Sequence, residues 1–332
     1  MALPVLERVE RRRRRRSGGA RRIVLLLVVA GTGVALVWIF RASSSSKLDV
    51  PRRPPPAAAT ARNAVQTPLT LIVGPRPLAP HPFTPPLSAR AAILVDARTG
   101  RVLWALRPHT RRPIASTTKI MTAILALERL GPRDLVTIDP SVPRAAPFRE
   151  GLLAGQRVRA WKLFYGLLLF SGNDDALALA IATAGSRPAF VAEMNREARR
   201  LGLRDTHFST PSGVVDRANY STAWDLAALT RYALRNPRFR GIVRTRVKRV
   251  PWPAPTFAKI YLNKNALLGQ YRGADGVKTG WTTRAGHCLV ASAQRDGAYL
   301  IAVVLAAPNR YRDAARLLNY GFGLRFVARS SG

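Results

Sequence analysis

The feature that most limits the fold of this chain is an uncharged apolar stretch near its amino terminus. Residues 23–40 read IVLLLVVAGTGVALVWIF, 18 residues without a charged side chain. As an α-helix they would span about 27 Å, close to the ~30 Å hydrocarbon core of a bilayer. Nine arginines precede the stretch, and basic residues gather on the cytoplasmic side of membrane segments. We therefore expect residues 1–22 in the cytoplasm and everything after residue 40 outside the membrane.

A cleaved signal sequence is the alternative interpretation of this stretch. Secretory signals carry an apolar region of about 7–15 residues, which is shorter than residues 23–40. No Ala-x-Ala cleavage site follows, and Ala42-Ser43-Ser44 is a weaker match. We favour a retained, single-pass transmembrane anchor. In both interpretations the remainder of the chain is exported.

Serine and proline dominate the next segment, residues 41–86. It contains four consecutive serines at 43–46, three consecutive prolines at 54–56, and further prolines up to residue 86. Such a composition cannot pack a core and favours an extended, semi-rigid spacer. We expect a linker over residues 41–86 and one folded domain over residues 87–325, which is long enough for a large core with a helical lobe.

Arginine makes the chain strongly basic, with a net charge of +36. Such an excess favours contact with polyanions, either nucleic acid or the anionic polymers of a bacterial envelope. Export argues against nucleic acid, and no RRM, KH or zinc-knuckle pattern is present. We therefore expect no nucleic-acid partner.

Cysteine and histidine offer little chemistry in this chain. Cys288 is the single cysteine and lies in an apolar run, so it forms no intrachain disulfide and is expected to fill core space. The four histidines are dispersed, without an HExxH pattern or a pair at metal-ligand spacing. We expect no metal site, no histidine-based triad and no cofactor.

Apolar runs of strand length stand at both ends of the expected domain, and runs of helix length lie between them. We expect strands at residues 91–95, 102–106, 276–278, 286–293 and 298–305, and helices at residues 116–130, 161–170, 174–184, 187–201, 222–235 and 311–319. Pro188 and Ser221 are expected near helix starts. This order indicates an α+β fold, in which the chain ends meet in one sheet beside a helical lobe.

The tetrapeptide Ser116-Thr117-Thr118-Lys119 opens one of the expected helices. Residues at i and i+3 share a helical face, so the Ser116 hydroxyl and the Lys119 amine can share a hydrogen bond. Free backbone N–H groups at a helix start favour negative charge on the hydroxyl. The apolar helix that follows would desolvate Lys119, lower its pKa and let it act as a neutral base. By itself S-x-x-K is common, so a capping serine followed by a surface lysine is the alternative.

A second polar tripeptide, Ser171-Gly172-Asn173, separates two apolar helical runs. Such a turn places a hydroxyl and an amide at the lip of a cleft. In a serine acylase, Ser171 would relay a proton to the leaving group, and Asn173 would bond the substrate amide and the lysine of the first motif. An ordinary helix–helix loop with a capping residue is the alternative.

A third motif, Lys278-Thr279-Gly280, lies in an expected edge strand. Its lysine and threonine supply a positive charge and a hydroxyl for a terminal carboxylate, and its glycine lets a peptide lie along the strand. The backbone amide of Trp281 can join that of Ser116 to form an oxyanion hole. A hairpin with an exposed lysine is the alternative.

The three motifs follow one another in the order S-x-x-K, S-x-N and K-T-G within a chain that we expect to be exported. Each motif has a purely structural alternative, but the three together argue against these alternatives. The sequence resembles the S11 family of D-alanyl-D-alanine carboxypeptidases, the low-molecular-mass penicillin-binding proteins. The resemblance covers about residues 91–322, and the matching stretches are PIASTTKIMTAILALE, LLLFSGNDDALALA, FVAEMNREARRLGLRDTHFSTPSG, YSTAWDLAALTRYAL, GVKTGWTTRAGHCLV and NRYRDAARLLNYGF.

This resemblance implies a β-lactamase/transpeptidase-like fold, with a largely antiparallel sheet flanked by helices and a helical lobe. The catalytic residues that it implies are Ser116 as the acylated nucleophile, Lys119 as its base, Ser171 and Asn173. The substrate-binding residues that it implies are Lys278, Thr279, Gly280, Trp281 through its amide, and Arg310. Many relatives continue into a second domain and a carboxyl-terminal anchor. This chain stops at Gly332, so anchoring is expected from the N-terminal helix.

The activity that the resemblance implies is removal of the terminal D-alanine from peptidoglycan stem peptides ending in D-Ala-D-Ala. It would proceed through an acyl-enzyme on Ser116 that β-lactam antibiotics also form, in a domain anchored outside a bacterial cell membrane. Three alternatives stay open. One is an endopeptidase that cleaves peptidoglycan crosslinks. A class A-like β-lactamase needs a water-activating glutamate, for which Glu193 and Glu197 are the candidates. The third is a non-catalytic envelope-binding protein.

Overall fold

The computed structural model describes residues 71, 85–214, 218–252 and 257–330. The predicted cytoplasmic segment, the predicted anchor at residues 23–40 and nearly all of the predicted linker lie outside these residues. Within the described part of the chain, every helix is too short or too polar to cross a bilayer.

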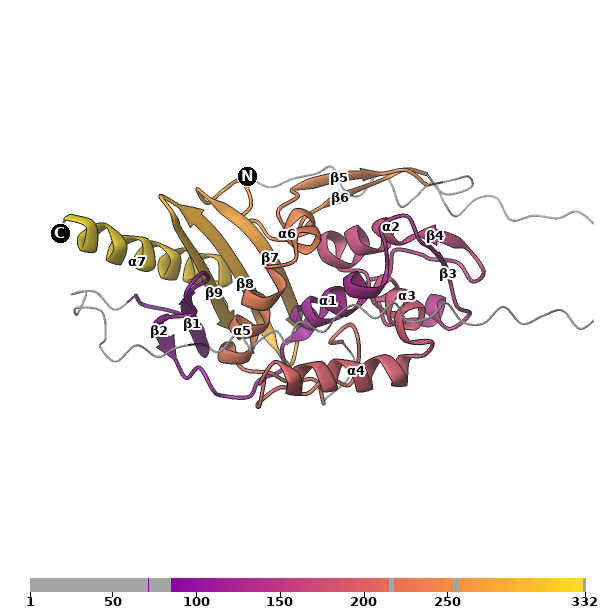
Figure 1. The fold of residues 1–332 in the computed structure, drawn as a ribbon, viewed down its shortest axis with the longest axis horizontal. Coiled ribbons are helices and arrows are strands. Elements are labelled where there is room, and N and C mark those ends of the chain that lie inside the picture. The colour runs from indigo at the N-terminus through magenta and orange to yellow at the C-terminus, as the bar shows by residue number, and fades with distance from the viewer. Residues whose placement is uncertain (1–70, 72–84, 215–217, 253–256, 331–332) are drawn as a thin grey trace, which may run out of the picture. The chain divides into compact units, whose positions relative to one another are not determined.

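One five-stranded sheet organises the domain (Figure 1), and every neighbouring pair in it is antiparallel. Its strands, in order across the sheet, are β2 (Val102–Leu106), β1 (Ala91–Asp96), β9 (Ala298–Leu305), β8 (Gly286–Arg295) and β7 (Ala274–Thr282). The first strand of the domain pairs with the last, with Ala91 opposite Leu305. The third motif lies on β7, at the edge of the sheet.

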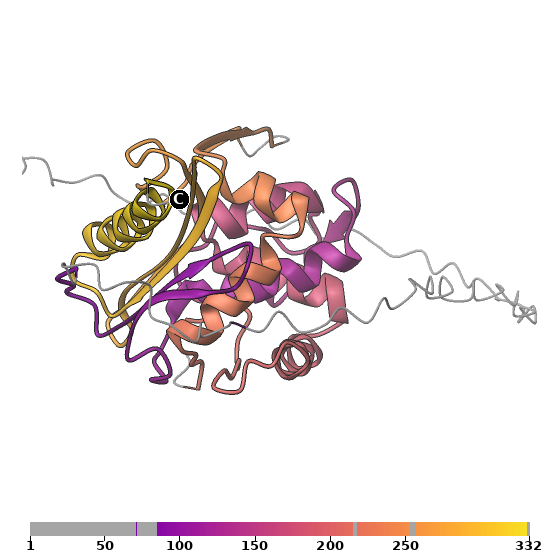
Figure 2. The ribbon, with the colours of Figure 1, turned by 60° about the vertical axis from the view of Figure 1, so that its left-hand side comes forward.

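Both faces of the sheet are buried, because alternate residues of each strand point to opposite sides. On β1, Ala92 and Leu94 pack in the cluster that includes Leu317 of α7 (Arg310–Ser330). Ile93 and Val95 pack in the larger cluster on the other face. Figure 2 shows α7 alone on one side of the sheet, with the remaining helices on the other. This arrangement confirms the α+β, largely antiparallel fold class that the sequence predicts.

The helices on the second face cover β9 and β1 and form a lobe beside β7. They are α1 (Lys119–Arg129), α2 (Ala160–Tyr165), α3 (Asn173–Ala184), α4 (Arg187–Arg200), α5 (Ala223–Ala233) and α6 (Pro237–Val243). The α4 helix begins at Ser186, whose hydroxyl accepts from the Ala189 amide, with Pro188 in its first turn. The cap of α5 is Thr222, which accepts from the Asp225 amide, so Ser221 is not the capping residue.

Four short strands and one helix are absent from the sequence expectations. The strands pair as β3 (Leu135–Thr137) with β4 (Arg157–Arg159) and as β5 (Val247–Val250) with β6 (Lys259–Leu262), and the helix is α6. In β4 only Val158 is buried, between two exposed arginines. Strands of three or four residues are too short to show an alternating apolar pattern, so the sequence alone does not reveal them.

Two expected helices have irregular ends at the motifs. The helix expected at residues 116–130 begins as a 3-10 turn, η2 (Ala115–Thr118), before α1. The helix expected at residues 161–170 is α2 followed by a π-helical turn, η4 (Gly166–Phe170).

Cys288 is fully buried in β8, and burial raises the pKa of its thiol to about 11, as expected of a residue that fills core space.

Candidate active site

The first motif places a hydroxyl and an amine in contact at the start of the lobe. Ser116 lies in η2 and Lys119 begins α1, so the two residues are one helical turn apart. The Lys119 Nζ atom lies 3.0 Å from Ser116 Oγ. Just before the serine, Ala115 has a φ of 46°, an uncommon value for a residue with a side chain. This local strain sets the angle at which Ser116 enters the helix.

Burial makes the Lys119 ammonium a stronger acid than that of an ordinary lysine. Its side chain has no solvent exposure, because it projects into the apolar core beneath η2. Desolvation lowers the pKa of Lys119 to about 7, although Asp175 and Asp174 favour its charged form. About half of the Lys119 side chains are therefore neutral near pH 7 and able to accept a proton.

Two oxygens besides the serine hydroxyl fix the direction of the lysine. Lys119 Nζ donates to Asn173 Oδ1 at 2.7 Å and to the Ser212 backbone oxygen at 3.2 Å. Sequence reasoning predicted the contact with Asn173 but not that with Ser212. The only local signal is Gly213, at φ 75°, where a Cβ atom would lie 2.1 Å from the Ala115 oxygen. This glycine lets the loop approach the nucleophile.

The second motif follows an unusual helix end. The η4 turn closes at Ser171, which adopts a left-handed conformation with φ 73°. Its amide and that of Gly172 both donate to the Gly166 oxygen. The Asn173 side chain is held at both ends, because Oδ1 accepts from Lys119 and Nδ2 donates to the Pro147 oxygen. The side chain therefore has one orientation.

Asp174 ties the second motif to the loop that faces it. Its carboxylate accepts from the amides of Glu150 and Gly151, both at 2.8 Å, and from that of Leu152 at 3.2 Å. The backbone N–H of Asn173 in turn donates to the backbone oxygen of Phe148. Segments that are more than twenty residues apart in the chain are thus joined at the edge of the site.

A buried pair of carboxyl groups lies behind the second motif. The side chains of Asp175 and Glu150 are almost fully buried and face each other. Desolvation, and then the charge of Glu150, raises the pKa of Asp175 well above its ordinary value. The Asp175 carboxyl also lies close against Gly166 and Gly172, where a Cβ atom would come within 2.4 Å and 1.9 Å of its oxygens. Glu150 also pairs with Lys259 Nζ at 3.5 Å, and the Asp175 carboxyl packs behind the turn at Ser171.

The third motif forms the opposite wall through the edge strand β7. Thr279 and Gly280 line the cavity next to Ser116. A Cβ atom at Gly280 would lie 3.1 Å from the Ser116 backbone nitrogen and 2.9 Å from the Ile114 oxygen. The glycine therefore allows the strand to pass close to the backbone of the nucleophile.

Lys278, the first residue of the third motif, is a buried lysine in β7. It is 1% exposed, and its Nζ donates to the Thr279 oxygen at 3.1 Å. Burial, and then the charges of Lys119, Lys264 and Arg310, lowers its pKa well below the ordinary value. Within the described part of the chain, Lys278 is not among the residues that line the catalytic cavity.

The three motifs enclose one cavity of about 560 Å³. Its cationic lining residues, within the part of the chain that the structure describes, are Lys264 and Arg310. Arg310 Nη1 donates to the Gly280 oxygen at 3.2 Å, and Arg312 does not line the cavity. Trp281 also lines it, with its side chain half exposed. Sequence reasoning missed Lys264, because it belongs to a loop that no motif marks.

Known proteins share this arrangement of sequence and fold. The sequence profile of the peptidase S11 family, described as D-alanyl-D-alanine carboxypeptidase, matches residues 79–309. A D-alanyl-D-alanine carboxypeptidase of Streptomyces sp. strain K15 is 38% identical over an alignment of 263 residues, which covers 72% of this chain and 89% of the relative. The D-alanyl-D-alanine carboxypeptidase DacF of Bacillus subtilis strain 168 is 32% identical over 70% of this chain and 62% of its own length.

The solved structure of the Streptomyces K15 DD-transpeptidase is similar in fold, with a TM-score of 0.68. It is 35% identical and covers 73% of this chain and 99% of that chain. The chain belongs to the S11 family of D-alanyl-D-alanine carboxypeptidases. Membership confirms the resemblance read from the motifs and the serine hydrolase class of the enzyme.

Two candidate glutamates for a β-lactamase-like reaction lie elsewhere in this S11 family member. Glu193 pairs with Arg129 at 2.7 Å, and Glu197 pairs with Arg200 at 2.5 Å. Both lie on α4, and neither lines the catalytic cavity. Of the described residues that line it, none is aspartate or glutamate. The described residues also hold no cluster of three or more His, Cys, Asp or Glu side chains able to bind a metal ion.

Proposed function

We propose that this S11 family member is a serine D-alanyl-D-alanine carboxypeptidase that removes the terminal D-alanine of peptidoglycan stem peptides. The observation that supports the proposal most directly is the 3.0 Å distance between Ser116 Oγ and the buried Lys119 Nζ. A neutral amine at this distance can take the proton of the hydroxyl as the hydroxyl attacks.

In the acylation step, Ser116 Oγ attacks the carbonyl carbon between the two D-alanines, and its proton passes to Lys119 Nζ. The carbonyl electrons move onto oxygen, where the backbone N–H groups of Ser116 and Trp281 are proposed to stabilise them. The close approach of β7 to the Ser116 backbone at Gly280 supports this oxyanion hole. The C–N bond then breaks, and the departing amine takes the proton from Lys119 through the Ser171 hydroxyl.

Release of the acyl group uses a water molecule. Water attacks the ester carbonyl, gives up a proton to Lys119, and the proton returns to Ser116 Oγ as the ester bond breaks. A β-lactam would acylate Ser116 in the same way, but its leaving nitrogen stays attached to the acyl group and hinders the attack of water. Thr279 and Arg310 are proposed to bind the terminal carboxylate of either ligand.

Covalent labelling with a fluorescent penicillin tests the nucleophile. We expect a labelled band with the wild-type protein and none with Ser116→Ala. Ser141→Ala is the matched control, because its hydroxyl lies outside the catalytic cavity and binds Asp139. Persistent labelling of Ser116→Ala would refute the assignment, and absence of labelling in the folded wild-type protein would support the non-catalytic alternative.

Mass spectrometry of muropeptides separates the peptidase activities. Loss of one alanine from a monomeric pentapeptide identifies a carboxypeptidase, whereas conversion of a crosslinked dimer to monomers identifies an endopeptidase. Rapid turnover of penicillin would instead indicate a β-lactamase. We expect the first product, with only slow release of penicillin.

A second candidate function is DD-transpeptidation, in which an amine replaces water as the acceptor. It is favoured by the similarity to the Streptomyces K15 protein, which is called a DD-transpeptidase and is 35% identical to this chain. Adding glycine or a D-amino acid to the assay distinguishes the two, because a transpeptidase forms a new peptide product in proportion to the amine. We expect hydrolysis to dominate.

We also propose that residues 23–40 form a single-pass anchor in the bacterial cell membrane and that residues 41–86 separate it from an extracytoplasmic domain over residues 87–325. The apolar sequence and the preceding arginines support this proposal. Carbonate extraction and protease treatment of intact cells test it. A retained anchor keeps the protein in the membrane pellet with its amino terminus protected. A mature amino terminus near residue 43 would show a cleaved signal sequence instead.

A further inference from the structure

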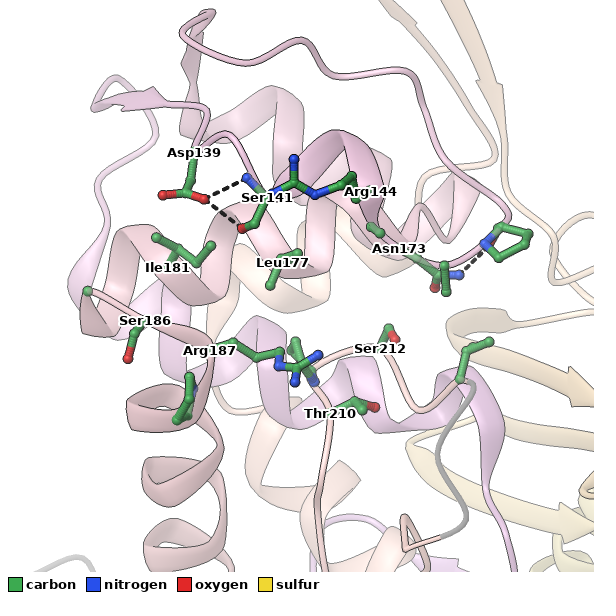
Figure 3. Close-up of a pocket in the computed structure, with 17 residues that line it drawn as sticks. Asp139, Ser141, Arg144, Asn173, Leu177, Ile181, Ser186, Arg187, Thr210 and Ser212 are labelled. Carbon is green, nitrogen blue, oxygen red and sulfur yellow. Dashed lines mark hydrogen bonds between the residues drawn. The ribbon is translucent and has the colours of Figure 1, made fainter.

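A second cavity lies beside the catalytic cavity, in the helical lobe (Figure 3). Its volume of about 780 Å³ is within the range of roughly 300–1,000 Å³ that is typical of ligand sites. Its walls come from residues 139–147, from α3, from the turn before α4 and from residues 210–214. We call it the lobe cavity.

The lobe cavity adjoins the catalytic cavity. The two share the lining residues Pro147, Asn173 and Val214. Asn173 stands at the boundary, with its side chain fixed by Lys119 on one side and by the Pro147 oxygen on the other. A ligand that is bound at Ser116 and extends past Asn173 therefore enters the lobe cavity.

The placement of the cations gives the direction in which a peptide would cross the site. Lys264 and Arg310 line the catalytic cavity, and Arg310 contacts the β7 backbone at Gly280. Under the proposed function, the carboxylate of the terminal D-alanine lies at this end and the scissile carbonyl lies at Ser116. The remainder of the donor peptide then leaves on the opposite side, past Asn173.

Two arginines supply the charge of the lobe cavity. Figure 3 shows Arg144 and Arg187 on opposite walls, with Leu177 and Ile181 of α3 between them. Among the described residues, neither arginine takes part in a side-chain ion pair. Their guanidinium groups are therefore available to an anionic ligand.

One carboxylate also lines the lobe cavity, and it offsets only part of this charge. Asp139 Oδ1 accepts from the Ser141 amide at 2.8 Å and from the Ser141 hydroxyl at 2.6 Å. These bonds, and then the charge of Arg144, lower the pKa of Asp139, so the group is ionised. With two arginines and one aspartate, the lining carries a net positive charge.

We propose that the lobe cavity binds the part of the donor peptide on the acyl side of the scissile bond, and that Arg144 and Arg187 select donors that carry a carboxylate there. The substrate class is an acidic peptide ending in D-Ala-D-Ala. This inference rests on the proposed function and deepens it, because it assigns substrate preference to residues outside the three motifs.

Two synthetic donors test the proposal. One is acetyl-γ-D-glutamyl-L-lysyl-D-alanyl-D-alanine with a free α-carboxylate on the glutamyl residue, and the other carries a carboxamide at that position. For the wild-type protein we expect kcat/KM to favour the carboxylate donor by about fivefold or more at low salt, the combined effect of two partly exposed ion pairs. The preference should fall as salt screens the charges.

The matched variants are Arg144→Gln/Arg187→Gln and Arg199→Gln/Arg204→Gln. Both remove two exposed arginines, but Arg199 and Arg204 line neither cavity. We expect the first pair to bring the ratio of the two donors close to one and the second pair to leave it unchanged. A wild-type ratio near one, or a preference that survives in the first variant, would overturn the inference.

Penicillin labelling separates this inference from the proposed function. Labelling of Ser116 at the wild-type rate in both double variants, together with an unchanged donor ratio, would leave the carboxypeptidase proposal standing while the lobe cavity loses its role. If Ser116 in the wild-type protein were not labelled, the proposed function would fail, and the inference would fail with it.

Discussion

The two walls of the catalytic cavity are built by different means. The strand wall, residues 278–281, is regular backbone at the edge of the main sheet, paired along its length with β8. The lobe wall, residues 166–175, consists of a π-helical turn, a left-handed serine and a helix start that rests on buried carboxyl groups. One wall obtains its geometry from the hydrogen-bond ladder of the sheet, and the other from side chains packed behind an irregular turn.

A buried lysine lies at each wall: Lys278 belongs to the strand wall, and Lys119 of α1 contacts Asn173 of the lobe wall. The surroundings of the two lysines differ. Lys119 contacts three oxygens and has two aspartates nearby that favour its charge. Lys278 contacts only the oxygen of its neighbour among the described residues and lies near three cations. A proton-accepting lysine needs a pKa near the working pH, and a balance of burial and negative charge achieves it at Lys119.

Replacing Lys119, the proposed base, is expected to have the largest effect on the acylation rate. In Lys119→Met the Ser116 hydroxyl loses its proton acceptor, so acylation by benzylpenicillin should slow by about 10³-fold. Stopped-flow measurement of the second-order rate constant checks this, and Lys248→Met, which alters a lysine outside the cavity, should keep the wild-type rate. A variant with more than a tenth of the wild-type rate would show that Lys119 is not the base.

Adding a methyl group to the lobe wall is expected to slow acylation nearly as much as the loss of Lys119. In Gly172→Ala the new Cβ atom would lie 1.9 Å from Asp175 Oδ2, so the turn must move and displace Ser171. Misplacement of about 1 Å costs on the order of 10²-fold in rate. Gly280→Ala meets milder contacts on the strand wall, starting at 2.9 Å, and should lose about tenfold.

A double variant tests the cause of this loss. Gly172→Ala/Asp175→Ala removes the clashing carboxyl and should recover part of the acylation rate, while Gly241→Ala, which has open space around its Cβ position, should behave as wild type. If the double variant were no faster than Gly172→Ala, pressure on Asp175 would not explain the effect.

The rate of acylation should rise with pH through about 7. The neutral form of Lys119 is the active one, and its pKa is lowered to about 7. The neutral fraction grows from about one tenth at pH 6 to about nine tenths at pH 8, so the rate constant should increase roughly tenfold. Measuring acylation from pH 5.5 to 9 checks this. A rate that is flat from pH 6 to 8 would contradict the assignment.

Neighbouring aspartates of the lobe wall should respond differently to the same substitution. Asp174 accepts bonds from several backbone amides as a carboxylate, and asparagine offers only one acceptor oxygen. Asp174→Asn should therefore lower the free energy of unfolding by about 1–3 kcal/mol. Urea unfolding at pH 7 measures the change, and a loss below about 0.5 kcal/mol would contradict the role of Asp174.

The smallest effect is expected at Asp175, because asparagine resembles its protonated form. Its pKa is raised in the folded protein, so the stability that its proton contributes is present below pH ~4 and is lost as the pH rises through the raised value. Asp175→Asn should remove this decline and change the unfolding free energy at pH 5 by less than about 0.5 kcal/mol. Unfolding curves from pH 4 to 8 check both points.

Local patterns in the sequence predict the strand wall better than the lobe wall. Apolar alternation around Lys278 and the glycine at 280 identify an edge strand, and the structure confirms that strand as β7. The lobe wall depends on Asp175 meeting Glu150 and on Ser212 meeting Lys119, contacts between distant segments. No period or motif encodes such a meeting, so only the fold reveals it.

The motifs identified most of the residues around the cavity and the lowered pKa of Lys119, but not that of Lys278. Ser116, Lys119, Ser171 and Asn173 come together at one site, as the spacing suggested. The sequence predicts that Lys278 supplies a positive charge for a ligand, and in the folded domain burial lowers the pKa of this lysine. The apolar helix after Lys119 predicts the lowered pKa of that lysine, whereas the burial of Lys278 depends on segments that are distant in the chain.

The pairing of β1 with β9 affects how this chain can mature. Ala91 has its sheet partner at Leu305, more than two hundred residues later. While the ribosome is still synthesising the chain, β1 can pair only with the adjacent β2, and the core stays incomplete until the last strand emerges. Under the proposed export, the polypeptide can pass unfolded through a translocation channel and fold on the far side. Under that proposal, the topology would leave the assembly of the hydrolase until the whole chain has crossed the membrane.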